Sequence, residues 1–260
     1  MAYKGPIWEG IYHSFIEVPI EGPGFDSETW IGNSLKKITA LRDEAEKNIP
    51  LPPTSNYREA LLPLLAGLVY YENKGLRALD FGGGIGFTYF QTIYGLPRAE
   101  GVEYHIVERE SVCQAGRQFF GTTYNKLFFH SQLPKAESTF DIVHSGSALQ
   151  YIDDWKQLIS QLCALSRKYL LLVDVPAGNI PTFVAAQNYY GSKIPTRFFN
   201  IKEFLAVIGS CGYDLIFNSV YQPTILGVEQ CLPMQNFEEK YQLKQACNLL
   251  FVKANAGPRG

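Results

Sequence analysis

From residue 77 onward, short apolar runs alternate with amphipathic stretches of helical periodicity. The apolar runs predict strands at 77–81, 103–108, 126–130, 140–144, 169–175, 213–221 and 247–253. The stretches between them predict helices near 87–95, 111–119, 154–167 and 201–210. Strands that alternate with helices in this way form a parallel sheet with helices on both faces. The pattern therefore predicts an α/β fold with a doubly wound, mostly parallel, seven-stranded sheet, in which the last strand can run antiparallel.

The residues before position 77 follow a different pattern. Residues 1–32 are rich in aromatics, Gly and Pro, which indicates irregular structure that packs on the main domain. Asn33 is expected to cap an amphipathic helix that runs to about residue 47, and a second, more apolar helix is predicted over 57–72. We therefore expect an N-terminal extension or lid over 1–56, a catalytic domain over 57–253 with a loop-rich insert at 176–200 and a long connection at 222–246, and a flexible tail at 254–260.

Composition and charge narrow the class of protein. A chain of 260 residues with a net charge of -2 can bury a sizeable core but has no basic excess, which argues against a nucleic acid partner. Its five cysteines are scattered and never in C-x-x-C spacing, which argues against a disulfide framework or a zinc site. The start does not resemble a signal peptide, and no apolar run reaches membrane-spanning length. We expect a soluble cytoplasmic protein without a metal.

The loop after the first of the seven strands carries the most specific signal. Residues 79–87 read LDFGGGIGF, an apolar run that ends in an acid and continues into alternate glycines. Glycine at Gly82, Gly84 and Gly86 permits a left-handed backbone and lets a ligand approach main-chain N–H groups. The spacing is D-x-G-x-G-x-G, which differs from the G-x-G-x-x-G of dinucleotide sites. A turn that only packs a helix on a strand is the alternative interpretation.

This spacing resembles the first motif of the Rossmann-like methyltransferases that depend on S-adenosylmethionine (SAM). In that family the glycine loop packs against the amino-acid end of the cofactor. The resemblance implies that Asp80 and the loop hold the methionine part, with Phe87 opening a helix whose N–H groups can receive a carboxylate. The loop residues implied as cofactor ligands are Gly82, Gly83, Gly84 and Gly86.

Ligands of doubly wound sheets lie beyond the carboxyl ends of the strands, so each predicted strand end suggests a role. Glu108 ends the second strand and can accept hydrogen bonds from both ribose hydroxyls, although a solvated acid is the alternative. After the third strand, Ser131 or Gln132 is expected beside the adenine, because the Asp that many methyltransferases place there is absent.

Residues 140–152 resemble the fourth motif of small-molecule methyltransferases. The small residues Ser145 and Gly146, with Ser147, leave room for cofactor and substrate. Gln150 and Tyr151 are expected to point toward the same region. Many relatives have His where Gln150 stands, and because Gln cannot act as a general base, any base must come from elsewhere.

Methyl transfer requires an aligned acceptor and, for a hydroxyl, a group that removes its proton. The candidate catalytic residues are His130, Asp174 and Tyr151. His144 is a further candidate base, but its position within a strand favours a buried, hydrogen-bonded histidine.

The polar and aromatic stretch at 187–200 is typical of a substrate-binding loop and contributes Tyr190 and Arg197. Arg197 is expected to bind either an acidic group of the acceptor or a local acid. His13 would reach the site if the N-terminal segment forms a lid, and a surface histidine is the favoured alternative.

Over nearly its full length the chain resembles a bacterial family of SAM-dependent methyltransferases that are often encoded among surface-polysaccharide (O-antigen) genes. Besides the motifs above, the resemblance rests on residues 8–12 (WEGIY), 145–152 (SGSALQYI) and 198–200 (FFN). It implies methyl transfer to a hydroxyl or amine of a small molecule or glycan, with S-adenosylhomocysteine as product. Two alternatives stay open, namely a non-catalytic SAM-binding protein and an NAD-linked oxidoreductase.

Overall fold

The computed structural model describes residues 5–47, 60–96, 99–135, 137, 139–189, 191–221, 224–225, 228–229 and 231–254. The chain divides into two compact units. The first unit comprises Met1–Gly24, Ser147–Cys163 and Leu172–Gly260, and the second comprises Phe25–Gly146 and Ala164–Leu171. The predicted domain boundaries at residues 56 and 253 stay predictions.

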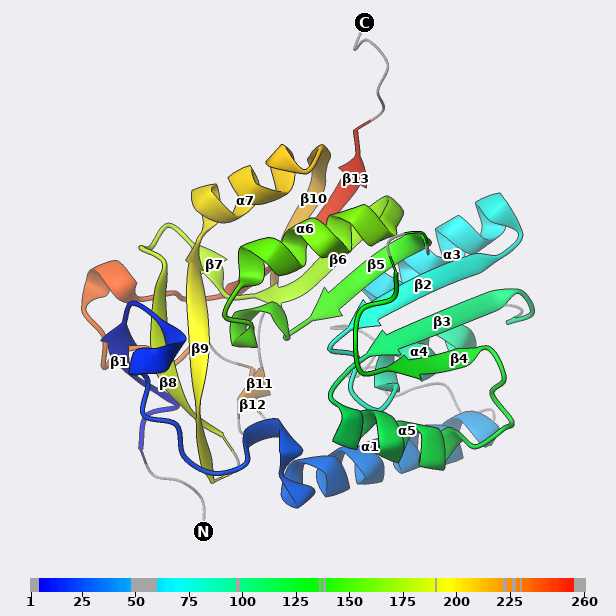
Figure 1. Ribbon diagram of the computed structural model, residues 1–260, viewed down its shortest axis with the longest axis horizontal. Helices are drawn as coiled ribbons and strands as arrows, with labels where there is room; N and C mark the ends of the chain where they lie inside the picture. Colours follow the sequence, from blue (N-terminus) through cyan, green and yellow to red (C-terminus); the bar gives the residue numbers. More distant parts are fainter. Residues whose placement is uncertain are drawn as a thin grey trace, which may run out of the picture. The chain divides into compact units, whose positions relative to one another are not determined.

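Seven strands form one sheet in the order β10-β13-β6-β5-β2-β3-β4 (Figure 1). They are β2 (Leu76–Phe81), β3 (Val102–Val107), β4 (Leu127–His130), β5 (Phe140–Gly146), β6 (Ser166–Val175), β10 (Tyr213–Tyr221) and β13 (Ala246–Lys253). β2 pairs in parallel with β3 and with β5, and β3 pairs in parallel with β4. β10 and β13 are antiparallel. The predicted fold class is confirmed, including the antiparallel last strand.

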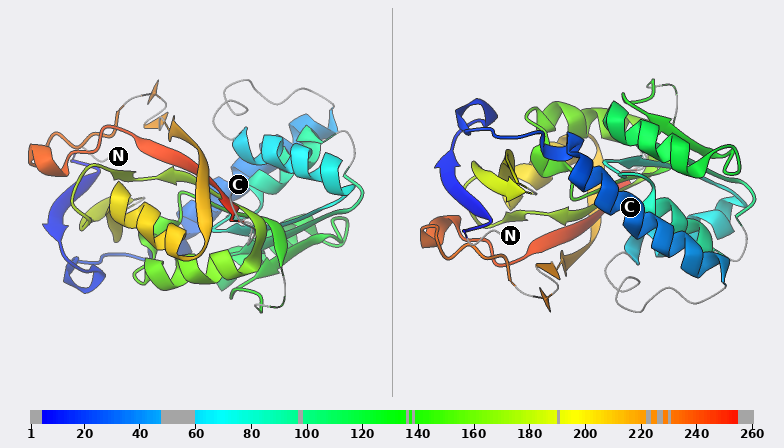
Figure 2. Two further views of the ribbon diagram at one scale, coloured as in Figure 1. Left: turned by 90° about the horizontal axis from the view of Figure 1, so that it is seen from above. Right: turned by 90° about the horizontal axis from the view of Figure 1, so that it is seen from below.

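In the second unit, helices pack on one another and on the strands (Figure 2). They are α1 (Glu28–Glu46), α3 (Leu61–Asn73), α4 (Phe87–Gly95) and α5 (Glu110–Phe120). Tyr89 and Phe90 of α4 are buried against Phe120 of α5, with ring centroids 5.7 and 5.0 Å from that of Phe120. This aromatic cluster fixes α4, and therefore the loop that precedes it, against the sheet.

The start of α1 differs from the prediction. Asn33 lies inside the helix, so its expected role as N-cap is wrong. Ser27 has that role, because its Oγ accepts a hydrogen bond from the Trp30 N–H at 3.1 Å. Its carbonyl also accepts the N–H of Ile31 at 3.0 Å, and Glu28 adds a favourable negative charge to the first turn. The sequence before Asn33 was interpreted as irregular because it is rich in aromatic residues. In the structure Trp30 lies in the first turn of α1 and packs edge-on against Phe25, which precedes the helix.

The first unit contains a second sheet of four strands in the order β1-β8-β9-β7. They are β1 (Trp8–Tyr12), β7 (Ala177–Gly178), β8 (Phe183–Tyr189) and β9 (Ser192–Asn200). The expectations of irregular structure within 1–32 and of a loop-rich insert at 176–200 are therefore wrong for these stretches. The sequence FVAAQNY of β8 buries both of its faces, so it shows no alternation of polar and apolar residues that would predict a strand.

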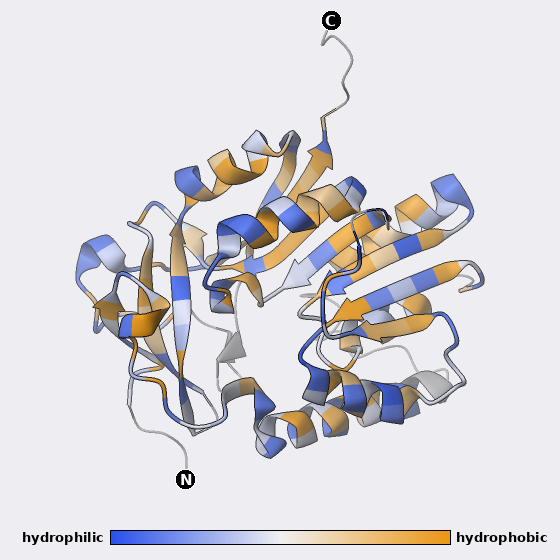
Figure 3. Cartoon of the chain, in the orientation of Figure 1, coloured by the Kyte–Doolittle hydropathy of each residue, from blue (hydrophilic) through white to orange (hydrophobic). Residues whose placement is uncertain are grey.

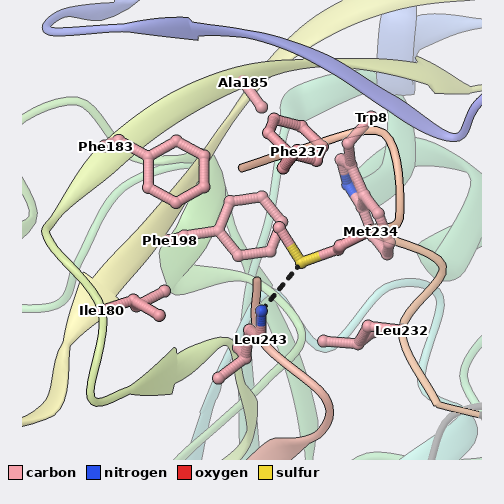
Figure 4. Close-up of a cluster of buried hydrophobic side chains, with 9 residues drawn as sticks. All are labelled: Trp8, Ile180, Phe183, Ala185, Phe198, Leu232, Met234, Phe237 and Leu243. Atoms are coloured by element: carbon pink, nitrogen blue, oxygen red, sulfur yellow. Dashed lines mark hydrogen bonds between the residues drawn. The ribbon is translucent and has the colours of Figure 1, made fainter. Parts of the chain in front are cut away.

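One face of this small sheet covers its own apolar core (Figure 4). Phe183 stacks on Phe198 with ring centroids 5.0 Å apart, and Trp8 meets Phe198 edge-on at 5.5 Å. The buried members of this cluster are Trp8, Ile180, Phe183, Ala185, Phe198, Leu232, Met234, Phe237 and Leu243. The N-terminal strand is thus tied into the first unit by burial of a large indole.

The remaining elements of the first unit are α6 (Trp155–Leu165), α7 (Ile201–Ser210), β11 (Thr224–Ile225), β12 (Val228–Glu229) and the 3-10 turns Phe15–Glu17, Leu149–Tyr151 and Glu239–Tyr241. Another 3-10 turn, Gly24–Asp26, precedes α1. α4 and α7 have the predicted bounds. Asn200 caps α7, and apolar residues dominate β6 (Figure 3). In the part of the chain that the structure describes, no helix is both long and apolar enough to cross a membrane.

Candidate functional site

The glycine loop between β2 and α4 has the backbone that its sequence predicts. Gly82, Gly84 and Gly86 have φ angles of 75°, 57° and 99°, all in the left-handed region. A Cβ at Gly86 would lie 2.9 Å from the ring of Phe120. At Gly84, in contrast, no described residue other than its two chain neighbours has an atom within 4 Å of the position that a Cβ would occupy. Gly84 therefore borders open space, as a backbone that cradles a ligand should.

Asp80 precedes this loop and is hydrogen-bonded beneath it. Its Oδ1 lies 2.7 Å from His144 Nδ1, and its Oδ2 accepts hydrogen bonds from Tyr104, at 3.0 Å, and from the Thr88 hydroxyl. Burial raises the pKa of Asp80, but the charge of His144 and these hydrogen bonds outweigh it and hold the pKa below its usual value. The structure thus gives Asp80 a role in supporting the loop, and its direct contact with a cofactor stays a prediction.

His144 is the buried histidine that its position in a strand favoured. It is 4% exposed, and its Nδ1 is occupied by Asp80. Tyr104 and Thr88, which complete the Asp80 network, were not identified from the sequence. Tyr104 and Ile106 are two residues apart on β3, so their side chains lie on the same face of the sheet. Because Ile106 pairs with Asp80, Tyr104 lies on the Asp80 face, which only the pairing of β2 with β3 shows.

Glu108 directly follows β3 and reaches the glycine loop of the same unit. Its Oε1 accepts the N–H of Gly84 at 3.3 Å, and its Oε2 accepts the N–H of Arg109 at 2.8 Å. Burial raises the pKa of Glu108, and the two backbone hydrogen bonds offset only part of this effect. The structure therefore brings together the loop and the acid that the sequence proposed as cofactor ligands.

The other predicted cofactor residues lie in different surroundings. Phe87 is half-buried at the start of α4, and Ser131 and Gln132 are exposed just after β4. Ser145 is buried in β5, and its Oγ has no hydrogen-bond partner in the described part of the chain. Gly146 ends β5. Gln150 is buried in the Leu149–Tyr151 turn of the first unit.

His130, at the end of β4, belongs to a hydrogen-bonded chain that the sequence did not reveal. Its Nε2 lies 2.8 Å from Nδ1 of His105, and Nε2 of His105 lies 2.7 Å from Glu103 Oε1. Because a carboxylate accepts, His105 donates through Nε2 and accepts the Nε2–H of His130, which leaves Nδ1 of His130 unprotonated. Burial lowers the pKa of both histidines. His130 pairs with Val107, so by strand alternation its side chain lies on the sheet face opposite Asp80.

In the first unit, Asp174 and Ser147 form a strained pair. Their φ angles are 55° and 53°, which is unusual for residues other than glycine and costs of order 1–3 kcal/mol each. The Ser147 hydroxyl donates to the Asp174 carboxyl, and the Ser147 N–H donates to the Val173 carbonyl at 3.0 Å. Burial raises the pKa of Asp174 to about 7. The sequence identified Asp174 as a candidate, but neither its backbone strain nor its Ser147 partner.

Tyr151 is a hydrogen-bond donor in this unit. Its hydroxyl donates to Gln187 Oε1 at 3.0 Å, and that oxygen also accepts the hydroxyl of Thr196 at 2.6 Å. Burial, with smaller contributions from Tyr189 and from the charge of Asp174, raises the pKa of Tyr151 well above its usual value. The phenol therefore stays protonated near neutral pH and cannot serve as a proton acceptor.

The structure describes two of the three predicted substrate residues, Arg197 and His13. Arg197 donates to the Asp153 carbonyl at 2.8 Å and to its carboxylate at 3.0 Å, which is the local-acid alternative. His13 is exposed, as the favoured alternative had it. Tyr190 lies outside the described residues.

A doubly wound sheet with a glycine loop after one strand and an acid after the next is the architecture of enzymes that bind nucleoside cofactors. The sequence matches the family described as "Methyltransferase domain" over residues 54–203, more than half of the chain. The chain therefore belongs to this methyltransferase family. SAM is the cofactor that this membership supports, in agreement with the prediction. None of the curated proteins matches the sequence.

Several solved structures share the fold. A chain from the complex between the Haloferax volcanii Trm112 methyltransferase activator and a methyltransferase is 13% identical, with a TM-score of 0.53 over 86% of this chain and 97% of that one. The CcbJ methyltransferase from Streptomyces caelestis is 15% identical, with a TM-score of 0.50 over 78% and 91%. The [4+2]-cyclase SpnF is 13% identical, with a TM-score of 0.51 over 75% and 82%. At these identities the likeness extends to the fold alone.

Proposed function

We propose that the protein transfers a methyl group from SAM to a hydroxyl, or an amine, of a small molecule or glycan. The observation that carries this proposal is the Glu108 carboxylate bonded to Gly84 of a left-handed glycine loop, within a chain of the methyltransferase family. We further propose a cytoplasmic role in surface-polysaccharide biosynthesis. The free cysteines of the described residues are consistent with a reducing compartment, and the polysaccharide role rests on the sequence resemblance.

The proposed SAM site consists of residues of the second unit. Gly84 borders open space, so a ligand can approach its main chain without meeting a side chain. Glu108 stands at the same loop, where its two oxygens suit the two hydroxyls of a ribose. Bound SAM supplies a methyl group on a sulfonium, which leaves as a neutral thioether. Asp80, held by His144 and Tyr104, keeps the loop in place.

The proposed general base, which accepts the proton of the acceptor, is Asp174. A carboxyl with a pKa of about 7 is largely ionised at slightly alkaline pH and is a better base than an ordinary Asp. Ser147 donates a hydrogen bond to it and so orients it. Asp174 would take the proton of the acceptor as the new O–C or N–C bond forms, and His130, with its unprotonated Nδ1, is the other candidate acceptor.

The experiment is a transfer assay with methyl-labelled SAM and a panel of sugar, nucleotide-sugar and phenolic acceptors. Asp174→Asn should lower kcat by about 100-fold or more, the usual contribution of a general base, while the affinity for SAM stays unchanged. Asp154→Asn is the matched control, because the Asp154 carboxylate caps α6 by accepting the Gln157 N–H and Asn can do the same. Full activity of Asp174→Asn would exclude Asp174 as the base and leave His130→Gln as the next variant.

A non-catalytic SAM-binding protein is the second candidate. It is favoured by Gln150, which stands where many methyltransferases have a histidine, and by the wide use of this fold for other chemistry. Tight SAM binding with no transfer to any acceptor of the panel would support it. Binding of NADH in place of SAM would revive the oxidoreductase alternative.

A further inference from the structure

Asn248 of β13 connects Asp174 to the edge strand of the sheet. Its Oδ1 accepts the backbone N–H of Asp174 at 3.2 Å, and its Nδ2 donates to Ser219 Oγ at 3.1 Å. Asn248 is only 6% exposed, and it pairs in register with Ser219 of β10. The two strands are neighbours in the sheet (Figure 1). Because a backbone N–H can only donate, the amide oxygen has to face Asp174, which leaves the amide nitrogen for Ser219.

This side chain is the acceptor that the structure gives to the Asp174 N–H. With a φ of 55°, Asp174 leaves the extended conformation, so the chain after it departs from the course of a regular strand. A buried N–H without an acceptor costs about 1–3 kcal/mol, which adds to the strain of the left-handed backbone. The Asn248 oxygen removes the first of these two costs. The extended conformation of Asp174 would otherwise be favoured, and in it the carboxyl would leave Ser147.

The pKa of the Asp174 carboxyl depends on which groups surround it. Among the described residues, the ionisable groups that interact with its charge are Cys247 and Tyr151, whose pKa values are both raised by burial, the Cys247 thiol to about 11. Both groups are therefore neutral near pH 7. Ser147 contributes a hydrogen bond that lowers the pKa of Asp174, and burial is the dominant effect that raises it. The acidity of Asp174 thus depends on where the backbone holds its side chain.

We infer that Asn248 is a positioning residue, which holds Asp174 in its left-handed conformation and so keeps the carboxyl beside Ser147 as a proton acceptor. Ser219 fixes the orientation of the Asn248 amide. The inference rests on the proposed function for its catalytic meaning, but the effect on the Asp174 carboxyl itself does not depend on turnover. The competing view is that Asn248 only satisfies buried polar groups and stabilises the sheet.

The test compares Asn248→Leu, which has a similar volume and no acceptor, with Asn248→Asp, which retains an oxygen toward the Asp174 N–H. The matched control is Asn218→Ala, on the neighbouring exposed position of β10. In Asn248→Leu, kcat should fall about tenfold to hundredfold, as expected for a misplaced catalytic group, with unchanged affinity for SAM. The midpoint of the pH profile should move to lower pH, since the carboxyl becomes more solvated. Asn248→Asp should recover most of kcat, but with its midpoint at higher pH because of the added charge.

A carboxyl titration by NMR with carbon-13-labelled Asp separates this inference from the proposed function, and the Asp174 signal is assigned by its loss in Asp174→Asn. The signal should titrate near pH 7 in the wild type and in Asn218→Ala, and at clearly lower pH in Asn248→Leu. If Asn248→Leu does not fold, Ser219→Ala should shift the same signal downward by a smaller amount. An unchanged Asp174 titration and an unchanged kcat, accompanied only by a lower Tm, would overturn the inference. If the Asp174 titration shifts in Asn248→Leu but the wild-type protein transfers no methyl group to any acceptor, Asn248 is still a positioning residue for Asp174, and the proposed methyltransferase function is rejected.

Discussion

Replacement of Glu108 by Gln tests the cofactor site with a change of very few atoms. In the structure each carboxylate oxygen accepts one backbone N–H, from Gly84 and from Arg109. The amide of Gln has one oxygen and one NH2 group, so one of these N–H groups would face a donor. The two ribose hydroxyls would likewise lose an ionised acceptor.

The size of the effect follows from the hydrogen bonds lost. A hydrogen bond to a charged group contributes about 1.5–3 kcal/mol, so the loss of one such bond should weaken cofactor binding roughly tenfold to 150-fold. The sign of the pH dependence follows from burial, which raises the pKa of Glu108. As the pH falls through this raised pKa, the carboxylate is protonated, and wild-type affinity should fall. Glu108→Gln has no such group and should show a flatter profile.

The assay is isothermal titration with S-adenosylhomocysteine at pH 8 and at pH 5. Glu100→Gln is the matched control, because Glu100 is exposed and precedes β3, whereas Glu108 follows the other end of that strand. Wild-type affinity of Glu108→Gln at both pH values, in a protein with unchanged Tm, would refute the assignment of Glu108 to the cofactor.

Three further predictions concern the same two units. Gly84→Val should abolish SAM binding while the far-ultraviolet circular dichroism spectrum is retained, since the side chain would occupy the open space beside the loop and would strain the backbone at a φ of 57°; unchanged affinity would contradict the site. His144→Leu should lower the free energy of unfolding in urea by about 1–3 kcal/mol or more, because it leaves Oδ1 of the buried Asp80 carboxylate without its hydrogen-bond partner, and no measurable loss would count against the pair. Asp174→Asn should raise the Tm more at pH 8.5 than at pH 5.5, because the cost of a carboxyl whose pKa rises from 3.8 to about 7 on folding grows with pH over this interval and levels off above it; an equal change at both pH values would disprove the raised pKa.

The parallel sheet and the cofactor loop could be predicted because their signals are local. Continuous apolar runs mark buried strands, and the bounds of α4 and α7 follow from periodicity with a glycine or an asparagine at one end. The glycine spacing after β2 requires left-handed backbone at alternate positions, and the φ angles at Gly82, Gly84 and Gly86 bear this out. Glu108 could be placed at the loop because parallel strands end at the same edge of a sheet.

The four-stranded sheet was harder to predict, because β8 lacks alternation and because β1 joins the β8–β9 hairpin from far away in the sequence. β1 pairs with β8 across more than 170 positions of sequence, for example Trp8 with Gln187. The strain at Ser147 and Asp174 was equally hidden, since nothing in a single sequence reports a positive φ at a residue other than glycine. The partners of Asp80 and His130 depend on which strands become neighbours, and a strand order cannot be derived from the composition of each strand alone.

The measurement that tests the central claim most directly is calorimetric titration of the wild-type protein with SAM, S-adenosylhomocysteine and NADH in parallel. Binding of the first two in the micromolar range, with no heat from NADH, is the predicted result. Binding of NADH alone, or silence from all three ligands, would contradict the assignment of this fold and its glycine loop to SAM.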